Sequence, residues 1–489
     1  MNTPYILPCN VAIYMDSLDF VWQNVAMQNW LPDLSSLTGP KYRAIAAALM
    51  DDIETGRLRA GDRLPPQRLL ADQLGIDLTT VTKAYNEVSK RGLIEGGGRR
   101  GSFVKAQPSL LAITNPSQPR SESIPPDNGM IAPPEPATGS FAMRYRHGVS
   151  ALMSLDNALG RFGYQPTGGA IPDREAGIAY LQMLGLDAPL DQLVLASGGQ
   201  NALQAIVQAA LKPGDAICVA AFAYTGFLAI ARRFGLRLIP VDADAQGLLP
   251  DAIDLACRTQ AVSALYVIPT NDNPTTRTMD APRRRAIAEI VERHGLTLIE
   301  DDAYGLQPEQ PLPPITSFVP DKGWYIASLS KIVSPALRVA YVRAPSVKAA
   351  WRLATEIHAS AIMPPPINAA LVSHWIHHGD LAALVAETRA ECIARQRIAA
   401  QALSSVNYAA HPDGFHLWIP LPTGLTLSSL LNGARSIGLS VVPSDAFATA
   451  PTDASPALRL SIGGALSHAQ LARTLGQFDA LMESGLSLV

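Results

Sequence analysis

A lysine beside two hydroxyl side chains is the first group in this chain that could do chemistry. Lys331 follows Ser328 and Ser330. These residues come directly after an apolar run at 324–327 that is typical of a buried strand. A lysine amine partly withdrawn from water has a lowered pKa and can form a Schiff base with an aldehyde. The hydroxyls and the guanidinium of Arg338 could bind a dianionic phosphate, although a serine-rich turn with a solvated lysine is the alternative interpretation.

Glycines and polar residues also follow the other apolar runs. Glu300, Asp301 and Asp302 come after one run, and three adjacent carboxylates repel one another unless cations lie nearby. Open α/β sheets bind ligands at the carboxyl ends of their strands, so these groups are candidates for one site. The other groups at such positions are Ser197-Gly198-Gly199-Gln200, Tyr224, Asn273 and Tyr304. Their structural alternatives are an ordinary βα turn, a core tyrosine and a solvated acidic turn.

Short apolar runs alternate with helical stretches from residue 141 onward. The runs lie at 193–196, 216–219, 236–241, 264–268, 296–299, 324–327 and 339–342. Such alternation predicts an α/β fold whose sheet is covered by helices on both faces. The pattern then changes to long helices and a smaller α+β unit around 414–421. We expect one domain over 141–489, with a small subdomain at approximately 350–489.

The composition fits a globular protein of two or three domains. The chain has 489 residues, of which 48% are hydrophobic and 17% are charged, and its net charge is −3. Residues 41–105 carry 12 Lys and Arg against 8 Asp and Glu, a net charge of +4, which leaves −7 for the rest. This asymmetry indicates that the N-terminal part binds an acidic partner.

Neither a metal site nor a membrane segment is expected. The four cysteines lie far apart and form no Cys-x-x-Cys pair, which fits a reducing compartment. No Lys or Arg precedes Lys41, so the basic segment of a signal peptide is missing. The longest apolar run, 216–231, is shorter than the roughly 20 residues that a membrane helix needs. We therefore expect a cytoplasmic protein without an anchor.

Residues 41–104 have the pattern of a helix-turn-helix domain with a wing. After a first amphipathic helix, Gln67–Leu74 is predicted to be a short helix closed by Gly75. Asp77 is a suitable N-cap for a third helix, whose apolar face contains Val81, Ala84, Tyr85 and Val88. Two short strands around a Gly/Arg tip at 97–100 predict the wing.

Two further segments are predicted to be an arm and a linker. Residues 1–40 mix polar and apolar side chains without a firm period, and their function is left open. Residues 105–140 are rich in proline, which predicts a linker. At roughly 3 Å per residue, an extended linker of this length spans on the order of 100 Å. It could hold the N-terminal module over the body of a different subunit.

The stretch 41–104 resembles the GntR-type winged helix-turn-helix. The residues that carry this resemblance are Gly61-Asp62-Arg63-Leu64-Pro65, Arg68, Leu70-Ala71, Leu74-Gly75, Thr80-Val81, Ala84-Tyr85, Gly92-Leu93 and Gly101-Ser102-Phe103-Val104. It implies that the third helix enters the major groove of double-stranded DNA with Thr79, Thr80, Thr82 and Lys83. Arg68, and the wing with Arg99 and Arg100, would touch the backbone or the minor groove. Asp77-Leu78 stands where the family commonly has Ser-Arg, which removes one expected base contact.

The body resembles fold-type I pyridoxal phosphate (PLP) enzymes, the aspartate-aminotransferase-like family. The motifs are Ser328-x-Ser330-Lys331, Pro335-x-Leu337-Arg338 and Asn271-Asp272-Asn273-Pro274-Thr275, where Thr276 replaces the usual Gly. The resemblance implies that Lys331 forms a Schiff base with PLP and that Asp301 pairs with the pyridine nitrogen. Asn273 and Tyr304 would reach the phenolic oxygen, and Tyr224 would stack on the ring. The phosphate would be held by Gly199, Gln200, Ser328, Ser330 and Arg338.

Two more residues imply a ligand and a second subunit. Arg459 lies between apolar neighbours and needs an anionic partner, which the resemblance identifies as the α-carboxylate of an amino acid ligand. Tyr164, in Tyr164-Gln165-Pro166-Thr167-Gly168-Gly169, matches a tyrosine that reaches the phosphate of the neighbouring subunit. The implied assembly is a homodimer with shared sites.

The two domains together resemble the MocR subfamily of GntR-type transcription regulators. This resemblance implies a PLP-binding regulator whose body senses an amino acid, an amine or PLP through aldimine chemistry at Lys331. One alternative is an active PLP-dependent aminotransferase with an accessory DNA-binding domain. Another is a DNA-binding protein whose body is a dimerisation scaffold without a cofactor. We favour the regulator, because a winged helix has no use in simple transamination.

Overall fold

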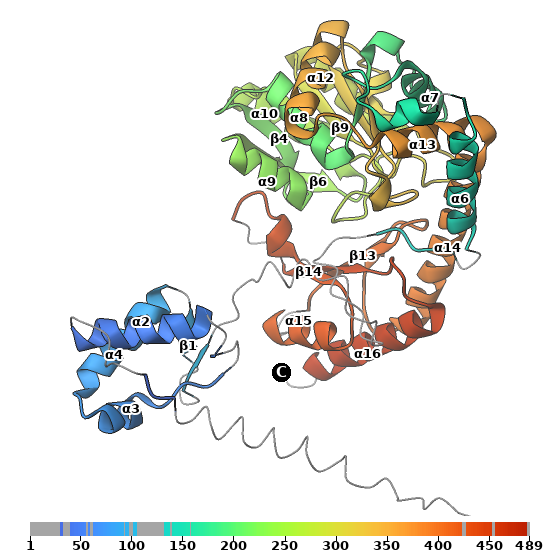
Figure 1. Ribbon diagram of the computed structural model, residues 1–489. Coiled ribbons are helices and arrows are strands. Elements are labelled where there is room, and N and C mark those ends of the chain that lie inside the picture. Colours follow the sequence, from blue (N-terminus) through green and yellow to red (C-terminus); the bar gives the residue numbers. More distant parts are fainter. Residues whose placement is uncertain are drawn as a thin grey trace, which may run out of the picture. The chain divides into compact units, whose positions relative to one another are not determined.

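The chain forms two compact units. The computed structural model describes residues 30–32, 40–54, 57–58, 62–91, 93–96, 101–104, 132–136, 139–156, 158–422, 427–451 and 455–486. The first unit is Met1–Pro119 and the second is Arg120–Val489 (Figure 1).

The first unit is a three-helix domain with a two-stranded wing. Its elements are α2 (Lys41–Glu54), α3 (Gln67–Leu74), α4 (Leu78–Lys90), β1 (Ile94–Gly96) and β2 (Ser102–Val104). Strands β1 and β2 pair antiparallel. The capping residues act as the sequence predicts: Gly75 ends α3 with a φ of 62°, and the Asp77 carboxylate accepts a hydrogen bond from the Thr79 amide at 2.7 Å. The expected helix-turn-helix and wing are confirmed.

The second unit is built on a seven-stranded mixed sheet. The strand order is β3 (Leu193–Ala196), β11 (Ala340–Arg343), β10 (Gly323–Ser328), β9 (Thr297–Asp301), β8 (Ala264–Val267), β4 (Ala216–Ala220) and β5 (Arg237–Val241). Strand β11 runs antiparallel to both its neighbours, and the other pairs are parallel. The seven predicted apolar runs are these seven strands.

Helices cover both faces of this sheet (Figure 1). The alternate residues of the strands on one face pack against α8 (Gly199–Ala210), α9 (Thr225–Arg233) and α12 (Val347–Ala361). The other face packs against α7 (Ile171–Gln182), α13 (Pro366–His378), α10 (Pro250–Thr259) and α11 (Ala281–His294). Burial on both faces explains why the strands are apolar without a break.

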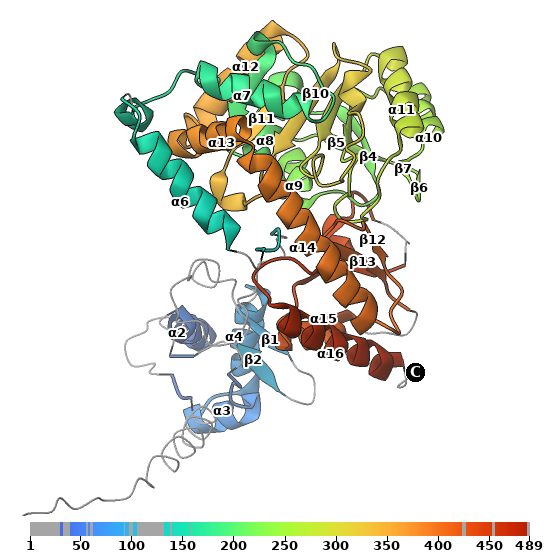
Figure 2. The same ribbon diagram turned by 90° about the vertical axis from the view of Figure 1, so that its right-hand side faces the viewer.

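A smaller α+β subdomain completes the second unit. Its sheet has the order β12 (Ala409–Ala410), β13 (His416–Pro420), β15 (Ala457–Ser461) and β14 (Val441–Pro443). Helices α15 (Leu427–Ser436) and α16 (His468–Leu486) share its apolar core with the end of α14 (Asp380–Ala402). In Figure 2, α14 runs from the helices of the large sheet to this subdomain.

The small subdomain begins later than the expected position near residue 350. Ala350, Leu353 and Ile357 of α12 belong to the core of the large sheet, and α13 also packs against that sheet. The packing therefore moves the boundary into α14. The amphipathic pattern of a helix shows that one face is buried, but it does not show which sheet covers that face.

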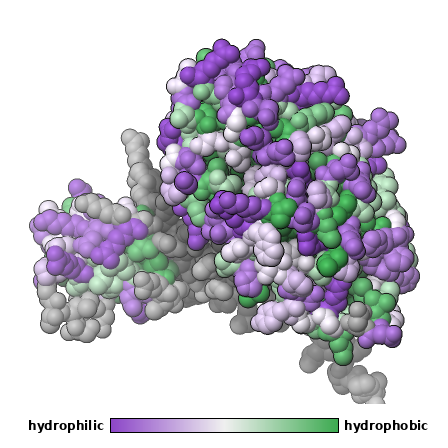
Figure 3. Space-filling model, turned by 90° about the horizontal axis from the view of Figure 1, so that it is seen from above, coloured by the Kyte–Doolittle hydropathy of each residue, from purple (hydrophilic) through white to green (hydrophobic). Residues whose placement is uncertain are grey.

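The surface of the second unit is mixed in character. Figure 3 shows a face on which hydrophilic residues predominate and hydrophobic residues form small groups between them. Within the described residues, no helix is both long and apolar enough to cross a membrane.

Candidate active site and DNA-binding surface

The carboxyl ends of β3, β8, β9 and β10 carry most of the residues that the sequence singles out. Ser328 ends β10, and Ser330 and Lys331 lie in the turn that follows. Asp301 ends β9, and Tyr304 lies three residues further on. The glycine turn after β3 opens α8. Because β9 and β10 are parallel neighbours, their last residues meet at the same edge of the sheet.

Asp301 is a buried carboxylate close to a cation. It is 8% exposed, and its Oδ2 accepts a hydrogen bond from the Tyr266 hydroxyl at 3.1 Å. Burial raises the pKa of Asp301 to about 6, while the Tyr266 hydrogen bond and the nearby charge of Lys331 favour the charged form. The structure thus brings the predicted Lys331 and Asp301 into one electrostatic environment.

The other two acids of the triplet face away from Asp301 and have structural partners. Glu300 accepts hydrogen bonds from the Ile315 and Thr316 amides at 2.8 and 2.7 Å. Asp302 accepts one from the Tyr325 hydroxyl at 2.9 Å. Burial raises the pKa of Glu300 to about 7, and the charge of Asp302 adds to this shift. Since side chains alternate along a strand, only the central acid of the triplet points into the site.

The glycine turn after β3 lies directly against an arginine. Gly198 has a φ of 82°, and a Cβ there would lie 2.8 Å from the Arg338 guanidinium carbon. A Cβ on Gly199 would lie 3.3 Å from the Ser328 side chain. The exposed Arg338 guanidinium donates to the Ser197 carbonyl at 2.8 Å. These groups form a small cradle of hydroxyls, guanidinium and helix N-terminus, which suits an anion.

Further predicted residues border this cradle. The Ser328 hydroxyl donates to the Ser330 hydroxyl at 3.0 Å. The Gln200 side-chain amide donates to the Gly226 carbonyl at 3.1 Å, which ties α8 to α9. Tyr224 caps α9 and is half-buried, and burial together with the charge of Asp301 raises the pKa of its hydroxyl.

The small subdomain contributes Arg459 to the same region. Arg459 lies on β15, is 4% exposed, and its Nη1 donates to the Asn273 Oδ1 at 2.8 Å. Its guanidinium also lies over the Phe447 ring, 4.9 Å from the centroid. Arg459 and Asn273 are therefore neighbours, as a ligand bound by both would require.

Tyr304 has a hydroxyl that the described residues do not satisfy. The side chain is 2% exposed and makes no hydrogen bond within the described part of the chain. Burial raises its pKa, and the charge of Arg459 acts in the opposite direction. A buried hydroxyl without a partner costs free energy, which indicates that another group belongs at this position.

Two residues of this site were not predicted from the sequence. Tyr266 of β8 holds Asp301, and its register opposite Ile299 puts it on the same face of the sheet as that acid. His416 of β13 is fully buried, and its Nε2 lies 3.1 Å from the Asp272 carbonyl. Burial and the charge of Arg459 lower the pKa of His416 to about 3, so its ring is neutral. The register of β8 against β9 was the missing signal for Tyr266.

Tyr164 is the predicted site residue that does not join this group. It lies in the segment before α7 and is 84% exposed. The structure describes one chain, and the predicted reach of Tyr164 into a neighbouring subunit stays a prediction.

In the first unit, the predicted DNA-binding residues lie on α3 and α4. Thr79 and Lys83 are exposed on α4, opposite the buried Val81 and Ala84. Thr80 and Thr82 are half-buried, and the Thr82 hydroxyl donates to the Gln67 side chain at 2.8 Å. Arg68 is exposed at the start of α3, whereas Arg99 and Arg100 of the predicted wing tip lie outside the described residues.

The fold and the site define a fold-type I aminotransferase body behind a winged helix-turn-helix domain. Residues 146–478 match the model of the family "Aminotransferase class I and II". Residues 41–104 match the model "Bacterial regulatory proteins, gntR family". The chain belongs to the class I and II aminotransferase family and carries a GntR-family domain in front, the domain pair of MocR-type transcription regulators.

Several known proteins are similar to this chain over most of their length. The HTH-type transcriptional regulator YdeF of Bacillus subtilis is 28% identical over 439 residues, which cover 89% of this chain and 92% of YdeF. The vitamin B6 salvage pathway transcriptional repressor PtsJ of Salmonella typhimurium is 27% identical, over 79% of this chain and 87% of PtsJ. The α-aminoadipate aminotransferase LysN of Thermus thermophilus has the same fold, with a TM-score of 0.65 and 24% identity over 74% of this chain and 94% of LysN.

Proposed function

We propose that the body of this regulator binds PLP on Lys331, and that a small ligand bound beside it changes DNA binding. The ligand is an amino acid, an amine or PLP itself. The observation that carries the proposal is the buried Asp301 carboxylate, held by Tyr266 beside the charge of Lys331. A buried carboxylate with a raised pKa needs a cationic partner, and a protonated pyridine nitrogen is such a partner.

Other features of the site fit PLP as well. The Tyr304 hydroxyl is buried and lacks a partner among the described residues, so it can donate to a phenolic oxygen. The cradle formed by Gly198, Gly199 and Arg338 suits a phosphate group. Both ends of the cofactor thus find matching groups on this chain.

Each residue has a distinct task in this proposal. PLP supplies an aldehyde that reacts with amines and a ring that withdraws electrons. Asp301 holds the proton on the ring nitrogen, and Asn273 donates to the phenolic oxygen beside Tyr304. Tyr224 stacks on the ring. Arg459 binds the carboxylate of an amino acid ligand and thereby connects the ligand to the small subdomain.

Two kinds of molecule are candidates for the signal. An amino acid or amine would replace Lys331 as the partner of PLP, and would shift the body between two states by binding one of them better. PLP itself as the signal is supported by PtsJ, which is named as a repressor of a vitamin B6 salvage pathway. In both cases the body is a sensor whose state is passed to the DNA-binding domain.

The winged domain is proposed to bind double-stranded DNA through α4. Thr79, Thr80, Thr82 and Lys83 would face the major groove, and Arg68, Arg99 and Arg100 would bind phosphates or the minor groove. We also propose the domain limits 41–104 and 105–140 for this reader and its linker. Because its target is DNA, the protein would work in the cytoplasm.

We propose a homodimer as the working assembly. Between residues 153 and 171, several large apolar side chains are at least 39% exposed, namely Met153, Leu155, Leu159, Phe162, Tyr164 and Ile171. Clustered exposed apolar residues are typical of a protein interface, and most soluble oligomers are symmetric homodimers. A partner subunit seated there would cover this segment and bring Tyr164 toward a second site.

Aminotransferase activity is the second candidate function. It is supported by the presence of Lys331, Asp301 and Tyr304 together at one sheet edge, since these are the groups that such chemistry needs. The discriminating assay incubates the PLP-loaded protein with an excess of an amino acid and of a different keto acid, which accepts the amino group and returns the cofactor to PLP, and it measures the keto acid formed from the amino acid. Many equivalents per chain favour the enzyme, and one equivalent or less favours the sensor.

The direct test of PLP binding is substitution of the lysine. Lys331→Ala is expected to abolish the visible absorbance of lysine-bound PLP and its trapping by borohydride. Lys348→Ala removes an exposed lysine of α12 and should behave as the unchanged protein. Undiminished covalent trapping in Lys331→Ala would contradict the proposal.

A further inference from the structure

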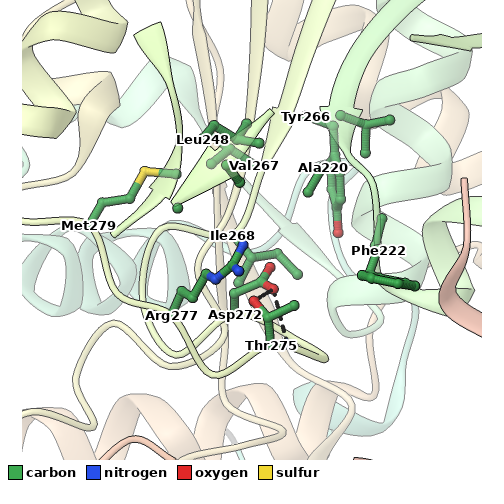
Figure 4. A pocket seen from close by; sticks show the side chains of 14 residues that line it. Ala220, Phe222, Leu248, Tyr266, Val267, Ile268, Asp272, Thr275, Arg277 and Met279 are labelled. Atoms are coloured by element: carbon green, nitrogen blue, oxygen red, sulfur yellow. Dashed lines mark hydrogen bonds between the residues drawn. The ribbon is translucent and has the colours of Figure 1, made fainter. Parts of the chain in front are cut away.

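A separate cavity lies beside the candidate active site, at the carboxyl ends of β4 and β8 (Figure 4). The space between its walls is about 420 Å³ when the part open to solvent is included. The small hairpin of β6 (Ala243–Asp244) and β7 (Gly247–Leu248) contributes to one side. The walls are mainly apolar, with Ala220, Leu248, Val267, Ile268 and Met279 among them.

Two oppositely charged side chains, Asp272 and Arg277, are among the residues that line this cavity. The Asp272 carboxylate receives two hydrogen bonds on Oδ2, from the Thr275 hydroxyl at 2.5 Å and the Thr275 amide at 3.2 Å. Within the described residues, the half-buried Arg277 guanidinium makes no direct hydrogen bond or ion pair, and its positive charge favours the charged form of the Asp272 carboxyl. Figure 4 shows both charged side chains among the apolar ones that line the space.

This charge pattern selects a class of ligand. A ligand with only a carboxylate would be attracted by Arg277 and repelled by Asp272. A ligand with only an ammonium group would be attracted by Asp272 and repelled by Arg277. We propose that the cavity binds an α-amino acid with a small apolar side chain, with its carboxylate on Arg277 and its ammonium group near Asp272. Its side chain would lie against Leu248, Val267 and Met279. The charged groups of the ligand and of the protein would then form ion pairs in a cavity that is partly shielded from water.

Three wall residues contact the candidate active site, and the proposed link between the two sites rests on the function proposed above. The Tyr266 hydroxyl donates to Asp301. The Asp272 carbonyl accepts from His416 of the small subdomain at 3.1 Å. The Phe222 ring lies 5.4 Å from that of Trp418, which is paired with Arg459 across β13 and β15. Occupancy of the cavity would therefore reach both the partner of the cofactor nitrogen and the carboxylate anchor.

The test is calorimetric titration of the PLP-loaded full-length protein with cycloleucine. This amino acid has an apolar ring and no hydrogen on Cα, so transamination cannot consume it. We expect two molecules bound per chain, one at Lys331 and Arg459 and one in the cavity. Arg277→Leu should lose the cavity molecule, and Arg459→Ala should lose the other. Arg285→Leu, an exposed arginine on α11 outside the cavity, should keep both.

The two ideas fail in different ways. One molecule per chain, lost in Arg459→Ala and unchanged in Arg277→Leu, would overturn the cavity inference and leave the proposed function standing. Loss of one molecule in Arg277→Leu and none in Arg459→Ala would support the cavity and contradict the role of Arg459. Asp272→Asn serves as a second variant in case Arg277→Leu does not fold, and it should also lose the cavity molecule. If cyclopentanecarboxylate, which lacks the amine, binds in the cavity as tightly as cycloleucine, the inference that the cavity recognises both charged groups of an amino acid is wrong.

Discussion

At the scale of single residues, three consecutive acids point to different sides of the sheet because side chains alternate along an extended chain. Glu300 and Asp302 are bound by backbone amides and a tyrosine hydroxyl, so their burial has a structural explanation. Among the described residues, Asp301 accepts a hydrogen bond from Tyr266 and lies near the charge of Lys331, and burial raises its pKa to about 6. The central acid is therefore the one that we propose to pair with a cationic group of the ligand.

Affinity for PLP should depend on pH through Asp301. Because its folded-state pKa is raised to about 6, the carboxyl is neutral below that pH and charged above it. A cationic ring nitrogen favours the charged form, so affinity should fall as pH drops below about 6, by up to about tenfold per pH unit. Fluorescence titration with PLP at a series of pH values from about 5 to 8 measures this dependence of affinity on pH.

The matched variants for this prediction are two neighbouring acids. Asp301→Asn should bind PLP more weakly at neutral pH and show a flatter profile. Asp302→Asn removes an acid that faces the other way, and it should keep the slope but move the midpoint to lower pH, because the charge of Asp302 raises the pKa of Asp301. An unchanged profile in Asp301→Asn would mean that another group is responsible.

At the scale of elements, the turns after the strands are what position the site. The turn between β3 and α8 uses Gly198 at positive φ, so that Arg338 can pack against its backbone and donate to Ser197. Any side chain at this position would displace the guanidinium. The cradle therefore depends on backbone conformation as much as on the charged group.

Gly198→Ala should weaken PLP binding and also destabilise the fold. An L-residue at a φ of 82° costs on the order of 1–3 kcal/mol, and the new Cβ would also collide with Arg338. Gly185→Ala is the control, since Gly185 has a φ of 70° with no atom near its Cβ position. The thermal unfolding temperature should fall in both variants, whereas the affinity for PLP should fall only in Gly198→Ala. Equal PLP affinity in the two variants would contradict the cradle.

In the winged domain, Arg68 should act as a phosphate contact. It is exposed at the start of α3, and Arg68→Ala should weaken binding to all DNA sequences and reduce the salt dependence by about one phosphate contact. Arg57→Ala is the control, because Arg57 is paired with Asp51 and Asp52. Fluorescence anisotropy over a salt series measures both quantities. A change confined to one base position would instead indicate that Arg68 reads a base.

The elements could be predicted from sequence far better than their packing. The seven strands are buried on both faces and so appear as unbroken apolar runs, and caps such as Asp77 mark helix ends. The start of the small subdomain was placed too early, because the covering of α12 by the large sheet is a property of the tertiary structure. Among site residues, Tyr266 and His416 escaped notice, since an aromatic residue inside an apolar strand is typical of core.

At the scale of the whole molecule, a GntR-family domain and an aminotransferase-like body are joined in one chain. The relatives YdeF and PtsJ match 89% and 79% of this chain. A symmetric dimer would present two readers to two half-sites of DNA, which is the usual geometry of helix-turn-helix proteins. The exposed apolar segment at 153–171 is the surface that we assign to this dimer.

Charges introduced into this segment should separate the dimer. Leu159 is 83% exposed and Phe162 is 64% exposed in the single chain. In the double variant Leu159→Glu/Phe162→Glu, the free energy gained by burying these two side chains against a partner subunit should be lost. A loss of about 3 kcal/mol or more corresponds to a roughly 100-fold weaker association. Sedimentation velocity measures the change, with Leu255→Glu on α10 as an exposed apolar control. An unchanged dimer would move the interface elsewhere.

The most direct test of a PLP-dependent DNA-binding sensor is binding of the full-length protein to DNA upstream of its own gene. The titration is made at fixed salt with and without PLP, and then with a panel of amino acids and amines. We predict tight, sequence-dependent binding whose affinity changes when PLP or one ligand is added, and a change that Lys331→Ala abolishes. Sequence-dependent binding that no ligand alters, or no specific binding under any condition, would contradict the account.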